Sequence, residues 1–116
     1  MNARRAERVA EALREELAEI IGYEMADPRL EAVCVVGVEV SRDLRRAQVR
    51  VTAAGDAERQ REAMRALEGA RHWIRRQMAG RIRLWRIPEF HFRAVSGQEQ
   101  EPGLDELGRN GQAGTE

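Results

Sequence analysis

Two alternating runs in the first half of the chain constrain its fold more than any other feature. Residues 33–40, VCVVGVEV, are rich in β-branched side chains, and residues 46–53, RAQVRVTA, alternate small or branched apolar residues with polar ones. The polar stretch SRDLRR joins them, which predicts two antiparallel strands. Because such a pair buries one face, other elements have to cover that face.

Strand alternation divides the first run into one face of Cys34, Val36, Val38 and Val40 and another of Val33, Val35, Gly37 and Glu39. Glu39 indicates that the odd-numbered face is the wetter one. Cys34 is the chain's one cysteine, so no disulfide forms within the chain. We expect it to be a small buried residue, because nothing near it in sequence offers the basic setting that reactive cysteines need.

Helical periodicity flanks this pair of strands. The spacing of apolar residues in 3–25 predicts an amphipathic helix that ends before Asp27-Pro28. Its apolar stripe consists of Ala6, Val9, Leu13, Leu17, Ile20 and Ile21. A second helical pattern follows the N-cap candidate Asp56 and runs from about Ala57 to Arg81, with apolar residues at Ala63, Leu67, Ala70, Ile74, Met78 and Ile82.

A third strand is predicted at residues 86–94, RIPEFHFRA, with Phe90 and Phe92 on one face. The order helix, strand, strand, long helix, strand predicts an α+β domain with its helices on one face of a three-stranded sheet. We assign residues 1–96 to this domain. Residues 97–116 are rich in Gly, Gln and Glu, and we expect them to form a disordered acidic tail.

Charge is unevenly distributed along a chain whose net charge is zero. Residues 51–96 hold ten basic and five acidic residues, and between Arg71 and Arg86 there are six arginines and no acid. All 20 basic residues are arginine, which binds phosphate in bidentate fashion, although genome composition explains that bias equally well. This run of positive charge without any acid favours a nucleic-acid partner over the alternative, a charged helix face that only contacts water.

A helical wheel of the second helix places Arg61, Arg65, His72, Arg76 and Arg83 opposite the apolar stripe, with Arg71 and Arg75 nearer its edge. The candidate RNA-binding residues are Arg71, His72, Arg75, Arg76, Arg81 and Arg83, with a second patch of Arg45, Arg46 and Arg50. Trp73 and Trp85 either stack on bases or cover the rim of the core.

Enzyme and metal motifs are missing from the sequence: no GxxxxGK[ST], GxSxG, HExxH or CxxC occurs. His72, His91 and Cys34 lack metal-ligand spacing. We therefore expect no catalytic residue, metal or cofactor. A second hypothesis is a protein-interaction or dimerisation module that uses the wetter sheet face of Val33, Val35 and Gly37. No apolar run is long enough to span a membrane and no signal peptide is visible, so a cytoplasmic location is expected.

Four segments together resemble the bacterial ribosome-binding factor A family. They are ADPRL at 26–30, VEVSRDLRRAQVRV at 38–51, ALEGARHWIRR at 66–76 and RIPEFHF at 86–92. The resemblance covers residues 3–96. It implies a KH-like domain of the second type, whose long helix is kinked.

The resemblance also implies a function. The family binds the free, immature small (30S) ribosomal subunit and assists late maturation and 16S rRNA processing, without enzymatic activity; a monomer is expected. Its helix kink has the pattern Ala-x-Gly, which here reads Ala70-Arg71-His72. His72 replaces the glycine, and Gly69 is an alternative source of the flexibility that a kink requires.

Overall fold

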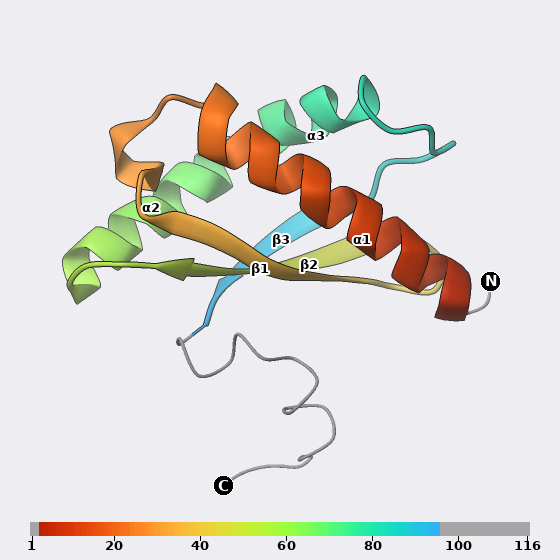
Figure 1. The fold of residues 1–116 in the computed structure, drawn as a ribbon, viewed down its shortest axis with the longest axis horizontal. Helices are drawn as coiled ribbons and strands as arrows, with labels where there is room; N and C mark the ends of the chain where they lie inside the picture. Colours follow the sequence, from red (N-terminus) through yellow and green to blue (C-terminus); the bar gives the residue numbers. More distant parts are fainter. Residues whose placement is uncertain (1–2, 96–116) are drawn as a thin grey trace, which may run out of the picture.

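The three strands form one sheet that carries the helices on one face (Figure 1). This computed structural model describes residues 3–95, so the predicted tail at 97–116 lies outside the described residues. The elements are α1 (Ala3–Glu19), β1 (Val33–Val40), β2 (Arg46–Ala53), α2 (Ala57–Gly69), α3 (Arg71–Ala79) and β3 (Glu89–Ala94). Their order confirms the predicted α+β fold, with the long helix divided into α2 and α3.

Strand β2 lies at the centre of the sheet. It pairs antiparallel with β1 and parallel with β3, where Arg46 lies opposite Glu89. A parallel pair needs a long crossover, which α2 and α3 supply. As a result β2 and β3 begin at the same end of the sheet, next to the turn that joins β1 to β2 (Figure 1).

A β-bulge in β1 corrects the predicted faces of that strand. The register shifts between Val35 and Gly37, so the side chains before and after the shift follow different alternations. Val33 and Val35 therefore face the core with Val38 and Val40. Cys34 is exposed, contrary to the prediction of a buried residue, because the bulge places it on the open face.

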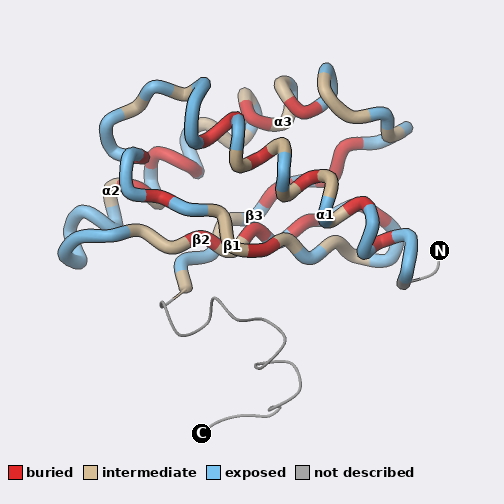
Figure 2. Tube along the Cα trace, viewed as in Figure 1, coloured by how far each residue is buried: buried red, intermediate tan, exposed pale blue. Residues whose placement is uncertain are grey.

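The core lies between the sheet and the helices (Figure 2). The whole predicted stripe of α1 is buried, together with Val49, Val51 and Phe90 of the sheet. After Glu19 the helix continues as a π-helical turn, Ile20–Glu24, which keeps Ile20 and Ile21 in the core. Leu44 in the β1–β2 turn is also buried, although its neighbours made the segment look polar.

The long helix breaks at Ala70. This residue has φ −98° and ψ 6°, outside the α region, and its carbonyl accepts a 2.8 Å hydrogen bond from Ile74 N. The predicted continuous helix from Ala57 to Arg81 is wrong in its continuity, and the kink that the family resemblance implied is confirmed. Gly69 ends α2 and His72 lies within α3, so neither has to adopt a glycine-like backbone.

Candidate nucleic-acid interface

Arg75 fastens the segment that follows α3. Its Nε and one Nη donate hydrogen bonds of 3.1 and 2.7 Å to the main-chain oxygen of Ile87, twelve residues later. Ile87 and Pro88 are buried beneath this contact. The predicted phosphate-binding residue Arg75 thus has a structural partner within the domain, and it fixes the position of the chain between α3 and β3.

A pocket of about 520 Å³ lies between α3 and this fastened segment. Its walls are His72, Arg75, Arg76 and Ala79 of α3 on one side and residues 85–87 on the other, with no carboxylate among them. Trp85 is 91% exposed, so its ring does not cover the core rim. It lies in the pocket wall beside the arginines instead.

Arg81 points back to α1, away from the pocket. Its guanidinium donates to Glu16 at 2.9 Å and to Glu19 at 3.1 Å, and it also pairs with Glu24. The hydrogen bond to Glu16 is the main cause that raises the pKa of Arg81 above its ordinary value. Arg81, which we predicted from the sequence to bind RNA, is therefore paired with three carboxylates within the domain.

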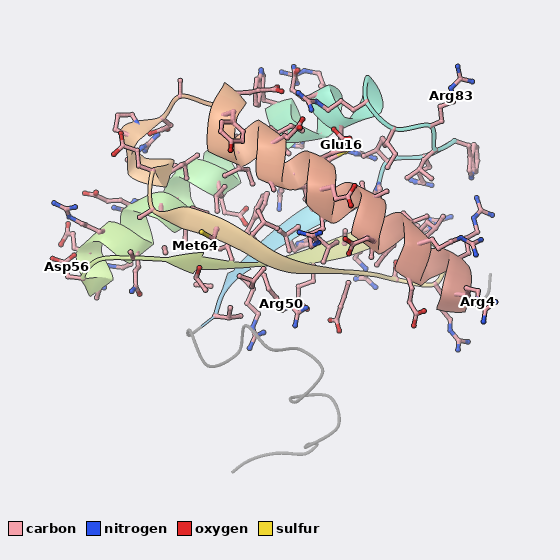
Figure 3. The ribbon with its side chains drawn as sticks, viewed as in Figure 1. Arg4, Glu16, Arg50, Asp56, Met64 and Arg83 are labelled. Carbon is pink, nitrogen blue, oxygen red and sulfur yellow. The ribbon has the colours of Figure 1, made fainter. Side chains whose placement is uncertain are left out.

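The other arginines of the run reach solvent to different degrees. Arg71 is half-buried and pairs with Glu68 at 3.3 Å. Three arginines of the run are exposed and form no ion pair with any residue in 3–95: Arg76, Arg83 and Arg86. Arg83 projects away from the domain (Figure 3). We call His72, Arg76, Arg83 and Arg86 the α3–β3 patch.

The prediction from sequence omitted Arg86, although the acid-free run ends on it. It also placed Arg83 on the helical wheel, but α3 ends at Ala79 and Arg83 lies in the following loop. The break at Ala70 separates Arg61 and Arg65 of α2 from the helix that carries His72 and Arg76. The continuous basic ridge of the wheel is therefore replaced by a helix face and a loop.

The second predicted patch, Arg45, Arg46 and Arg50, lies on β2 and the turn before it. Arg50 projects from the face of the sheet opposite the helices (Figure 3). Its guanidinium lies so close over Gly37 that a Cβ at this position would collide with it. The broad groove that includes Arg46 and Arg50 also contains Glu7, Glu11 and Glu39, so its charge is mixed.

The turn before β2 is ordered by polar contacts around Asp43. The Ser41 hydroxyl donates to its carboxylate at 2.7 Å, and the Arg45 main-chain N–H does so at 3.0 Å. These bonds, that of Ser41 first, lower the pKa of Asp43 below its ordinary range. Arg45 itself lies 3.8 Å from the same carboxylate, so part of its charge is balanced.

The apolar sheet face proposed for protein interaction is not exposed. Val33 is buried and Val35 packs against the core, while Gly37 is covered by Arg50. The open face presents Cys34, Glu39, Gln48, Arg50 and His91 instead. Within residues 3–95, no three His, Cys, Asp or Glu side chains are grouped so as to hold a metal ion. None of the helices there has the length and apolar character to cross a membrane.

Comparison with known proteins decides the family. The family model "Ribosome-binding factor A" matches residues 5–107. The chain belongs to this family. Ribosome-binding factor A of Solibacter usitatus (strain Ellin6076) is 43% identical over 107 residues, which cover 92% of this chain and 87% of that protein.

Solved structures of ribosome-binding factor A agree with the fold. The crystal structure of the Thermus thermophilus protein matches with a TM-score of 0.69 and 31% identity, over 77% of this chain and 94% of that one. A homology model of the Thermus thermophilus protein, fitted into the cryo-EM map of its complex with 30S, matches with a TM-score of 0.62 and 33% identity. That match covers 72% of this chain and 88% of the other. The KH-like fold implied by the family resemblance is thereby confirmed.

Proposed function

We propose that this protein binds the free, immature 30S subunit and assists late maturation and processing of its 16S rRNA. Membership of the ribosome-binding factor A family supports this proposal, as does the 30S complex of the Thermus thermophilus relative. We propose further that the protein acts in the cytoplasm, as a monomer, by binding and not by catalysis.

The observation that carries the proposal is the α3–β3 patch. Its three arginines are exposed and form no ion pair among residues 3–95, so their charges are available to a partner. Guanidinium groups of this kind bind phosphate oxygens through charge-assisted hydrogen bonds. Phosphate contacts carry little sequence information, so the shape of the rRNA has to supply most of the specificity.

Charge reversal within the patch tests the proposal. We expect the double variant Arg76→Glu/Arg86→Glu to lower co-sedimentation with purified 30S subunits on the order of tenfold or more, because two phosphate contacts become repulsive. Arg75 is left unchanged, since its reversal would break the hydrogen bonds to Ile87 and disturb the fold.

The control is Arg59→Glu/Arg61→Glu, which makes the same charge change on exposed residues at the start of α2, where Arg61 lies 3.8 Å from Glu58. Figure 1 shows the start of α2 at the opposite end of the domain from the α3–β3 segment. We expect this control to bind like the unmodified protein. Equal binding by both variants, or equal loss in both, would contradict the assignment of the site.

A further inference from the structure

The aromatic side chain of Trp85 is exposed to solvent. Among the described residues, the large hydrophobic side chains that are exposed are Tyr23, at 84%, and Trp85, at 91%. A single exposed aromatic residue is common, but Trp85 differs because it forms the wall of a pocket. A tryptophan buries roughly 150–250 Å² when it is covered, so a partner that stacks on it removes much apolar surface from water.

The main chain just after Trp85 is anchored to the domain. Arg75 holds the main chain at Ile87, two residues after the tryptophan, and Ile87 and Pro88 are buried. On the other side the wall is a regular helix, α3. The pocket, of about 520 Å³, is an open depression in the surface, so a planar group can reach the exposed indole from solvent.

The charge of the pocket selects the chemical class of its occupant. Its lining includes three arginines and a histidine but no carboxylate. Arg76 of α3 and Arg86 of the loop line the same pocket as the indole, and neither forms an ion pair within residues 3–95. A planar group that carries anionic groups suits both the indole and the unpaired arginines, and a nucleobase with its neighbouring phosphates is such a group.

We propose that the pocket binds one unpaired base of a single-stranded RNA segment, stacked on Trp85, with the flanking phosphates bound by Arg76 and Arg86. This inference rests on the proposed function and names the form of RNA that the same site takes. Bases in a duplex are stacked on their neighbours and are not available to the indole. The base is therefore from a loop, a bulge or a strand end, and stacking makes its identity unimportant.

Fluorescence of Trp85 reports on this contact directly. The chain has two tryptophans, so Trp73→Phe leaves Trp85 as the one tryptophan, and excitation at the red edge of the indole absorption avoids Tyr23. We expect oligoadenylate to quench the emission of Trp85, and a blunt RNA duplex at equal phosphate concentration to quench it far less. Trp85→Ala should weaken oligoadenylate binding on the order of 10- to 100-fold, Trp85→Phe much less, because phenylalanine also stacks. Thermal unfolding of each variant checks that the fold is kept.

The outcomes separate this inference from the proposed function. Arg76→Glu/Arg86→Glu should weaken binding of oligoadenylate and of 30S subunits together. If 30S subunits bind but Trp85→Ala binds oligoadenylate as tightly as the unmodified protein, the inference is wrong and the proposed function stands. Equal quenching by the duplex, or by polyglutamate at equal charge, would also overturn it. If neither oligoadenylate nor 30S subunits bind, both proposals fail.

Discussion

Each arginine between Arg71 and Arg86 is defined by what its guanidinium contacts. Arg81 binds carboxylates of α1 and of the π-helical turn after it, and Arg75 binds a main-chain oxygen, so both join elements of the domain. Three others contact no carboxylate among the described residues: Arg76, Arg83 and Arg86. Residues of one type and one sequence run thus divide into those that hold the fold together and those that face a partner.

The contacts of Arg81 predict an effect on stability and little on binding. Arg81→Ala leaves Glu16, Glu19 and Glu24 close together without their shared cation, so we expect the midpoint of thermal unfolding to fall by a few degrees. Arg83→Ala makes the same charge change in the exposed loop and should leave the midpoint unchanged. Differential scanning calorimetry of the two variants decides the point, and equal midpoints would contradict a structural role for Arg81.

The turn at Asp43 predicts a pH dependence of stability. Because folding lowers the pKa of this carboxyl from its ordinary value of 3.8, its charge stabilises the fold above that pH, and the contribution is lost as the pH falls through the folded pKa. Asp43→Asn keeps the shape but not the charge. We expect the variant to be less stable than the unmodified protein near pH 6, and the gap to close below about pH 3.8 in urea titrations. A gap that stays constant would show that the charge is not involved.

Helix α2 ends at Ala70, where the backbone leaves the α region. No single side chain in this segment predicts the break. Gly69 precedes the break but has helical backbone, with nothing within 4 Å of where a Cβ would stand. His72, in place of the family's glycine, is the second residue of α3 and needs no special backbone angles. The family pattern marks the location of the kink, and the kink does not depend on glycine at its third position.

Substitution of Gly69 tests this account of the kink. We expect Gly69→Ala to raise the free energy of unfolding by about 0.5–1 kcal/mol, because alanine restricts the unfolded chain and fits the folded one. Gly55→Ala is the control: Gly55 has φ +108°, a conformation that strains any residue with a Cβ, so that variant should be destabilised. Chemical denaturation measures both. A loss of stability in Gly69→Ala would mean that the kink uses the glycine.

Hydrophobic periodicity in the sequence predicted the helices and strands of this fold. It did not predict the bulge in β1 or the long-range ion pairs. The stripe from Ala6 to Ile21 and the alternation of β2 depend on burial of one face, which periodicity records directly. The bulge that turns Cys34 outward lies between Val35 and Gly37, and the isolated glycine in this strand is its one local signal, which alternation alone does not take into account. In the same way, the carboxylate partners of Arg81 lie more than fifty residues earlier, so charge counts could not separate Arg81 from Arg83.

The net charge of the whole molecule is zero, but its positive and negative side chains are not evenly distributed over the surface. The groove along β1 mixes both signs, whereas the pocket beside α3 contains arginine and histidine alone among its charged side chains. Because salt screens distant charges, an rRNA phosphate at short range interacts with the charge of this local surface and not with the total charge of the protein. The pocket beside α3 is therefore basic although the net charge of the chain is zero.

This uneven distribution of charge predicts a modest salt dependence. If three arginines of the α3–β3 patch neutralise three phosphates, the slope of log K against log salt concentration is about −2 on single-stranded RNA. Binding through all six arginines of the run would give a slope of about −4. Titration of oligoadenylate at several salt concentrations distinguishes the two, and a slope near zero would favour apolar association with no phosphate contact.

Crosslinking to rRNA shows which surface of the protein meets the 30S subunit. The protein is bound to immature 30S subunits and irradiated, and the crosslinked peptides are mapped by mass spectrometry. We expect crosslinks to 16S rRNA within residues 72–86, with Trp85 among the modified residues. Crosslinks confined to the open face of the sheet around Arg50, or to the first turns of α2, with none in residues 72–86, would contradict this expectation.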